Sequence, residues 1–162
     1  MEEIMILKRL AAVALAATMA FGMVACKKET TSTTLPEVRV SESGTVGDFN
    51  YTIRECELAK YQQQYFSERG FYIDALEQDD SPEFVFISCG KKGTSGYEIH
   101  VQDIKIDSSN NVTITVFEVE PAKGADTEKG EFYPAVEVTL MPWVESVTVV
   151  GFDGTVYKEA EM

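Results

Sequence analysis

Alternation of apolar and polar residues is the strongest pattern along the chain. The segment 112–116, Val-Thr-Ile-Thr-Val, alternates strictly, which predicts a β-strand with one buried face. The segment 97–106 alternates too, but its apolar positions shift by one residue after Val101. Such a shift in a period of two predicts a β-bulge near Gln102 and Asp103. Because turn-forming residues separate the two segments, we expect them to form a hairpin.

Further strands follow from shorter patterns. The run Phe84-Val85-Phe86-Ile87 is almost continuously apolar, which is typical of a strand buried on both faces. Asp153-Gly154 predicts a hairpin turn between 147–152 and 155–157. The remaining predicted strands are 83–89, which contains the apolar run, 136–140, which Pro142 ends, and two weaker segments, 49–53 and 71–73.

One segment has helical spacing. Apolar side chains recur at that spacing between Glu57 and Arg69, and Gly70 stands where a helix would end. One helix with six or seven strands predicts an α+β, mostly β fold. We expect an antiparallel sheet curled into a small barrel or sandwich, with the helix packed against it.

The first residues resemble an export signal. Lys8 and Arg9 precede an uncharged run, 10–24, which is shorter than the ~20 residues that span a bilayer, so we predict a cleaved signal peptide over 1–25. Met23-Val24-Ala25-Cys26 resembles a lipobox, although Met23 replaces the usual leucine. That resemblance implies an acylated Cys26 and stable membrane attachment through two chains. The alternative is an ordinary secretory signal with an incidental cysteine.

The rest of the chain predicts one tethered domain. Residues 26–37 form a polar, Thr-rich tether after Cys26, and 38–162 suffice for a single β-rich core. The net charge is −13, which disfavours nucleic-acid binding. We expect the domain on the outer face of the cell membrane, held by its lipid anchor.

Few residues in the domain suggest catalysis. His100 is the only histidine, and we expect it on the solvent face of a strand. Cys56 and Cys89 remain after lipidation, and either a disulfide or two free, buried thiols would fit. The acidic clusters at 77–83 and 126–131 do not match a calcium loop. We therefore predict no catalytic residue, no metal site, no cofactor and no enzymatic activity.

A glycine-rich segment, Gly90 to Tyr97, predicts a rigid connection that either completes the core or docks a protein. Its Thr94-Ser95-Gly96-Tyr97 resembles the Thr-Gly-Gly-Tyr loop of the PrcB C-terminal domain family, with Ser95 in place of one glycine. Pro121 and Phe132-Tyr133-Pro134 match the family's later loop, and the resemblance covers about 84–149.

The resemblance implies a non-catalytic subunit that associates with or stabilises a surface protease. The expected partner is thus another envelope or secreted protein. The residues expected to contact it are Gly90, Gly93, Thr94, Ser95, Gly96, Tyr97, Pro121, Phe132, Tyr133 and Pro134. Two alternatives stay open: an envelope lipoprotein that binds a small ligand or a metal, and a hydrolase that uses acidic residues.

Overall fold

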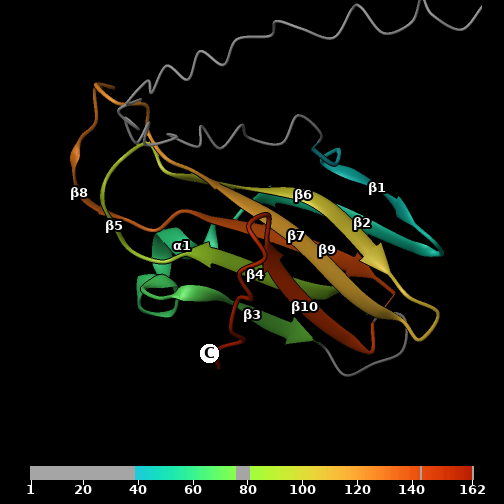
Figure 1. Cartoon of the computed structure of the whole chain (residues 1–162). Coiled ribbons are helices and arrows are strands. Elements are labelled where there is room, and N and C mark those ends of the chain that lie inside the picture. Colours follow the sequence, from blue (N-terminus) through green and yellow to red (C-terminus); the bar gives the residue numbers. More distant parts are fainter. Residues whose placement is uncertain (1–38, 76–80, 143, 162) are drawn as a thin grey trace, which may run out of the picture. The chain divides into compact units, whose positions relative to one another are not determined.

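Two β-sheets carry the fold in the computed structural model, which describes residues 39–75, 81–142 and 144–161 (Figure 1). The predicted signal peptide, Cys26 and the tether lie outside the described residues. The larger sheet has the order β1-β2-β9-β4-β3, and all of its neighbouring strands are antiparallel. Its strands are β1 (Ser43–Val46), β2 (Phe49–Glu55), β3 (Arg69–Ala75), β4 (Glu83–Cys89) and β9 (Ala135–Met141).

The second sheet has the order β10-β7-β6. Its strands are β6 (Glu98–Ile106), β7 (Asn111–Val119) and β10 (Ser146–Gly151). β6 and β7 form the predicted hairpin, and the register shifts between Val101 and Asp103, which confirms the predicted bulge. At the hairpin turn, the Asp107 carboxylate accepts backbone N–H bonds from Ser109 and Asn111.

One pairing differs from the expected antiparallel arrangement: β10 runs parallel to β7. The chain leaves β7, passes through β9 in the other sheet and returns to β10. Parallel neighbours need a long crossover connection of this kind, and local alternation in the sequence carries no information about it.

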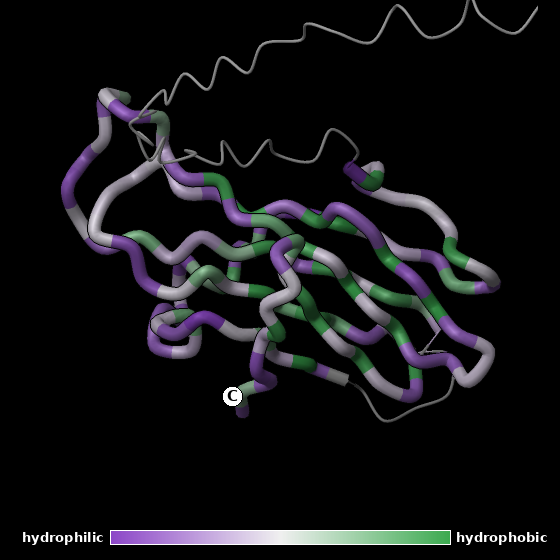
Figure 2. The backbone as a smooth tube through the Cα atoms, viewed as in Figure 1, coloured by the Kyte–Doolittle hydropathy of each residue, from purple (hydrophilic) through white to green (hydrophobic). Residues whose placement is uncertain are grey.

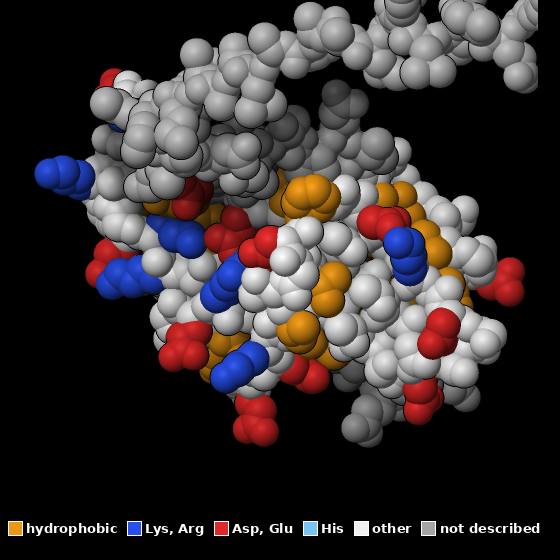
Figure 3. All heavy atoms as spheres, viewed as in Figure 1, with side chains coloured by type: hydrophobic (Ala, Val, Ile, Leu, Met, Phe, Trp, Pro, Cys, Tyr) orange, Lys and Arg blue, Asp and Glu red, His pale blue; other side chains and the backbone are white. Residues whose placement is uncertain are grey.

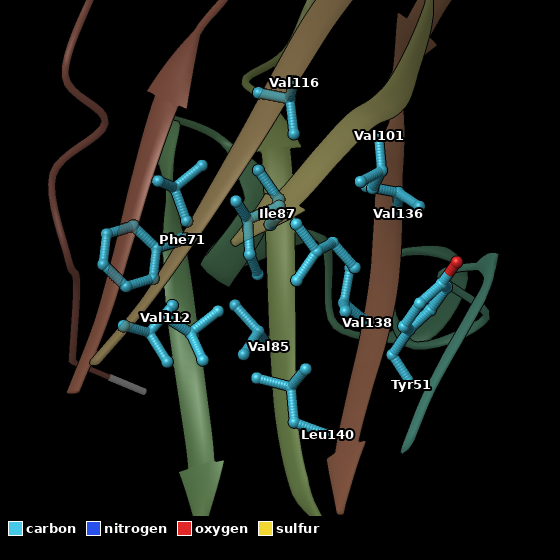
Figure 4. Close-up of a cluster of buried hydrophobic side chains, with 14 of the residues drawn as sticks. Tyr51, Phe71, Val85, Ile87, Val101, Val112, Val116, Val136, Val138 and Leu140 are labelled. Carbon is cyan, nitrogen blue, oxygen red and sulfur yellow. The ribbon is translucent and has the colours of Figure 1, made fainter. Parts of the chain in front are cut away.

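The two sheets share one hydrophobic core and are not closed into a barrel, so the fold is sandwich-like. Figure 4 shows side chains from both sheets in this core, such as Val85 of β4, Val112 of β7 and Val138 of β9. Val85 and Val138 are fully buried. Figure 2 shows hydrophobic and hydrophilic residues alternating along the strands, and hydrophilic residues at several of the turns. The strand periodicity therefore predicted the buried faces.

The predicted helix over 57–69 was wrong in length. The structure has a short α-helix, α1 (Leu58–Tyr61), followed by a 3₁₀ helix, η1 (Gln63–Phe66). Gly70 lies in β3 instead of ending a helix. A Cβ at Gly70 would lie 2.7 Å from the carbonyl oxygen of Lys158, so close backbone packing explains this glycine.

The two short helices cover the outer face of the larger sheet. Phe66 is fully buried there, against Tyr72 of β3 and Phe86 of β4. This second cluster explains the continuous apolar run in β4, because alternate side chains enter the main core and the outer cluster. Among the described residues, no helix has the length and apolar character needed to cross a bilayer.

The C-terminal segment, residues 155–161, closes one side of the sandwich (Figure 1). The predicted Asp153-Gly154 turn forms, and Val156 bridges to Val150 of β10. The segment does not continue as a hairpin strand. It crosses instead to the edge of β3, where Phe71 donates its N–H to Lys158 O over 3.0 Å.

Candidate functional site

A small two-stranded sheet brings the two predicted docking loops together. β5 (Lys92–Thr94) pairs with β8 (Lys129–Phe132), with Lys92 opposite Phe132 and Thr94 opposite Lys129. These strands lie within the two segments that the sequence singled out, 90–97 and 121–134. We call these two segments the loop pair. Their adjacency follows only from the fold, because 23 residues separate them.

Ser95 strengthens the loop pair instead of weakening it. Its N–H donates to Glu128 O over 2.9 Å, and its Oγ accepts the Glu128 N–H over 2.9 Å. Among the described non-glycine residues, only Asn110 has a positive φ. The structure therefore does not require a glycine at the Ser95 position, and the serine adds a hydrogen bond that glycine could not make.

Gly96 and Gly90 are both positions of the loop pair that favour glycine. Gly96 has a φ of +90°, a backbone conformation that side chains disfavour, and an added Cβ would lie 3.0 Å from Pro121 Cβ. Gly90 also has a positive φ, and a Cβ there would lie 2.9 Å from the backbone nitrogen of Arg69. By contrast, Gly93 is exposed and a Cβ on it would meet nothing within 4 Å.

Charged and aromatic side chains of the loop pair contact one another. Lys91 forms an ion pair with Glu131, and the Tyr133 hydroxyl donates to Glu131 over 3.1 Å. These contacts lower the pKa of Glu131, with the Lys91 hydrogen bond the largest cause. Lys92 lies 5.1 Å from the centre of the Tyr97 ring, within range of a cation–π contact.

Glu118, near the end of β7, links the loop pair to the body of the domain. Its carboxylate contacts Lys92 Nζ at 3.2 Å and Arg69 Nε at 2.7 Å, and it accepts the Tyr157 hydroxyl bond over 2.8 Å. Arg69 also lies 4.4 Å from the centre of the Tyr157 ring. Sequence reasoning missed this cluster, because its members are far apart along the chain and share no local pattern.

A groove of about 900 Å³ begins beside the loop pair. The loop pair contributes aromatic and small side chains to it, including Tyr97, Phe132, Tyr133 and Pro134. Val40 adds apolar surface from the chain before β1, and Ile53 and Val136 add it from the larger sheet. Figure 3 shows that most of the visible Lys and Arg side chains lie on the half of the molecule that carries β5 and β8.

The two domain cysteines are free and buried, so the disulfide alternative is wrong in this structure. Cys56 donates its N–H to Ala135 O and Cys89 donates to Pro134 O, so the two residues flank the start of β9 on opposite sides. Residues on either side of one strand lie about 9–10 Å apart, beyond the ~7 Å Cα limit for a disulfide. The side chains also enter different core clusters.

His100 is half-buried and not fully solvent-facing. Its Nε2 lies 2.6 Å from Glu98 Oε2, and its ring packs against Phe117 with the centroids 5.4 Å apart. Arg39 lies 5.1 Å from the centre of the same Phe117 ring. Within the described part of the chain, no group of three or more His, Cys, Asp or Glu side chains is arranged to hold a metal ion.

The structure describes only part of the two acidic clusters. Residues 77–80 lie outside the described part of the chain. In the other cluster, Glu128 takes part in the loop pair through its backbone and Glu131 through its carboxylate. These hydrogen-bonding roles of Glu128 and Glu131 depend on the pairing of β5 with β8.

Comparison with known proteins gives one match. The family model described as PrcB C-terminal matches residues 84–140, which begins in β4, ends in β9 and includes the whole loop pair. No curated protein matches the chain, and no solved structure matches it. The predicted family is confirmed over a slightly shorter range than 84–149. Over residues 84–140, the match therefore supports the PrcB C-terminal domain family that the loop motifs predicted.

Proposed function

We propose that this protein is a non-catalytic accessory module that binds another envelope or secreted protein, with a surface protease as the leading candidate. In this proposal Cys26 carries the lipid anchor, and the domain stands on the outer face of the membrane. The loop pair provides the contact surface.

The pairing of β5 with β8 is the observation that carries the proposal. It joins two segments into one surface and keeps several aromatic side chains half-buried at its margin, among them Tyr97, Phe132 and Tyr133. Half-buried aromatic residues on a rigid scaffold are favoured as anchors in protein interfaces. The match to the PrcB C-terminal family covers this surface and supports the same reading.

The side-chain chemistry of the loop pair also favours binding over catalysis. Its carboxylate Glu131 is tied to Lys91 and Tyr133, and its cation Lys92 is tied to Glu118. Groups held in this way give a surface a fixed shape and charge. They are poorly placed to exchange protons with a substrate, because each would first have to break an existing ion pair.

Co-purification from the native envelope after cross-linking tests the proposal. Tyr97→Ala and Phe132→Ala should each reduce capture of a defined partner by about tenfold or more, the loss expected for an interface anchor. Phe152→Ala is the matched control, since Phe152 is 47% exposed and lies in the turn after β10. Circular dichroism on the same variants shows whether the fold is kept.

A backbone variant tests the shape of the loop pair separately. Gly96→Ala should displace Pro121 and reduce capture, because the new Cβ would lie 3.0 Å from Pro121 Cβ. Gly154→Ala controls for backbone strain, because Gly154 lies outside the loop pair, has a similar φ of +84° and has no atom within 4 Å of an added Cβ. Capture of a partner that is indifferent to Gly96, Tyr97 and Phe132 would contradict the proposed contact surface.

A further inference from the structure

The two open sides of the sandwich differ: the C-terminal segment covers one, and a groove lies along the other. On one side, the C-terminal segment pairs first with β10, where Tyr157 N–H donates to Val149 O over 3.0 Å. It then pairs with β3, where Ala160 N–H donates to Phe71 O over 2.9 Å. Tyr157 points into the core and is 3% exposed, while Lys158 is exposed. An extended segment thus closes this side by bonding to the edges of both sheets.

On the opposite side, β6 is the edge strand of the smaller sheet and the groove runs beside it. Six consecutive residues, 96–101, line the groove. Because alternate residues of a strand point to opposite faces, a consecutive run means that the edge of β6 borders the groove. Edge strands present unpaired backbone N–H and C=O groups that can pair with another chain.

The facing wall of the groove is also an incompletely paired edge. β1 pairs with β2 only as far as Thr52, so residues 53–55 of β2 extend beyond β1. The Ile53 N–H donates to Glu42 O, but Arg54 and Glu55 have no strand partner on that side among the described residues. The groove therefore lies between two sheet edges, as the C-terminal segment does on the other side.

The floor of the groove would accept apolar side chains. Ile53, Ile99, Val101 and Val136 line it, and all four pack in or against the main core. The loop pair lies at one end of the groove and adds the rings of its aromatic residues. An extended segment here would place every second side chain on this floor, as Tyr157 does on the opposite side.

Arg54 and Lys60, two of the three Lys and Arg residues that line the groove, already have carboxylate partners. Arg54 donates to the buried Glu137, and Lys60 contacts both Glu55 and Glu57. Arg39 packs over the Phe117 ring. Arg54 and Lys60 are therefore neutralised within the domain, whereas Arg39 makes no ion pair among the described residues and keeps its charge.

The negative charges are less completely matched. Glu42 lines the groove and makes no ion pair among the described residues, and Glu98 contacts only the imidazole of His100. Glu42 and Glu98 outnumber the one unpaired cation, Arg39, so the uncompensated charge along the groove is negative, within a chain of net charge −13. Complementary charge on the occupant is positive.

We propose that this groove binds an extended peptide segment of the partner, which adds as a strand to the edge of β6 and carries a lysine or arginine opposite Glu42 and Glu98. The inference rests on the proposed function and names the chemistry of the partner. It assigns peptide recognition to strand addition, in which backbone hydrogen bonds supply affinity and alternate side chains supply specificity.

Selection from a random linear heptapeptide library on the purified full-length chain tests the charge of the occupant. Enriched peptides should contain Lys or Arg next to apolar residues. Their affinity should fall about two- to fivefold in each of Glu42→Gln and Glu98→Gln, as expected for an exposed ion pair. Glu145→Gln is the matched control, because Glu145 is exposed and does not line the groove.

Backbone methylation of the best peptide tests strand addition directly. N-methyl groups at every second residue should abolish binding in one phase and leave it nearly unchanged in the other, because only alternate N–H groups of an added strand face β6. Hydrogen exchange should slow at 98–101 when the peptide binds. Equal effects in both phases, acidic or purely neutral selected peptides, or protection elsewhere would overturn the proposal.

The two proposals fail separately. If native partner capture depends on Tyr97 and Phe132 but peptide selection gives one of the contradicting results, only the groove inference is wrong. If peptides bind the groove as expected but substitutions in the loop pair do not change capture of the native partner, the proposed contact surface is wrong.

Discussion

Burial controls the chemistry of single side chains in this domain, and Cys89 is the clearest case. The residue is 4% exposed, and burial is the largest cause that raises the pKa of its thiol to about 12. Burial likewise raises the pKa of the Cys56 thiol. Because the thiolate is the nucleophile, both groups should be inert in the folded protein.

Alkylation tests this prediction at each cysteine. Iodoacetamide at pH 8 should leave Cys56 and Cys89 almost unmodified in the native protein and modify both in 6 M guanidinium, as mapped by peptide mass spectrometry. Alkylation of the native protein at the rate of an exposed thiol would contradict the burial argument. A linked peptide containing both residues would show a disulfide that this fold does not allow.

Glu83 is a second buried group, at the start of β4. It is 4% exposed, and its Oε2 accepts the Val144 N–H over 3.2 Å. Burial is the largest cause that raises its pKa, and the charge of Glu159 adds to it. A raised pKa in the folded state means that Glu83 favours folding most at low pH, and that this contribution is lost as the pH rises through the folded-state pKa.

Replacing Glu83 with glutamine removes the titration and keeps an oxygen that can accept the Val144 bond. The melting temperature of Glu83→Gln minus that of the wild type should therefore increase as the pH is raised from 4 to 7. Glu145→Gln, measured in parallel, corrects for the loss of one exposed negative charge. A difference between Glu83→Gln and the wild type that is constant with pH, or that reverses in sign, would exclude the assigned role of burial.

At the level of elements, Tyr157 joins the C-terminal segment to β3 and β7. Its hydroxyl donates to Glu118 and accepts from Arg69 Nη2 over 3.1 Å. Both bonds involve charged groups, which make the stronger class of hydrogen bond. The contact therefore fixes the segment that closes one side of the sandwich.

Tyr157→Phe removes both bonds and keeps the buried ring. The free energy of unfolding should fall by about 1–3 kcal/mol, the range for hydrogen bonds to charged groups. Urea denaturation measures this loss, and Tyr61→Phe should give no change because Tyr61 is 80% exposed. Equal stability of Tyr157→Phe and the wild type would mean that water replaces the hydroxyl without cost.

The elements also show what the sequence could predict. Period-two alternation located β6 and β7, and the one-residue shift after Val101 located the bulge. Both signals exist because successive side chains of a half-buried strand face the core and the solvent in turn. The helix over 57–69 was overextended, since Phe66 is buried while Tyr61 is exposed, and apolar spacing alone does not distinguish them. Gly70 resembled a helix end but serves close packing against Lys158.

The sequence identified the two segments of the candidate site but not the way in which they pair. Its two segments have distinctive residues, so each could be identified alone, but their pairing through β5 and β8 depends on the whole fold. The Glu118 cluster could not be found, because Arg69, Lys92 and Tyr157 meet Glu118 across long stretches of chain. Long-range ion pairs leave no periodic signal in a single sequence.

For the whole molecule, the proposed attachment of the domain to a membrane depends on Cys26. The predicted cleavage would leave Cys26 as the first residue, followed by a polar segment and the domain that begins near 38. Removing residues 1–25 would take away two acidic and two basic residues, so the net charge would stay at −13. A negatively charged domain near anionic lipid headgroups gains no electrostatic attraction, and attachment must then come from the acyl chains.

Cys26→Ala should therefore abolish membrane attachment. In the native host, the wild type should incorporate a clickable fatty acid and sediment with membranes. Cys26→Ala should incorporate none and lose at least about nine-tenths of its membrane-bound fraction. A single acyl chain gives only marginal membrane binding, and a protein without an acyl chain should bind more weakly still. Cys56→Ser is the control, since Cys56 is buried in the domain and should not be acylated. Membrane binding that survives in Cys26→Ala would place the attachment elsewhere and point to the partner itself as the anchor.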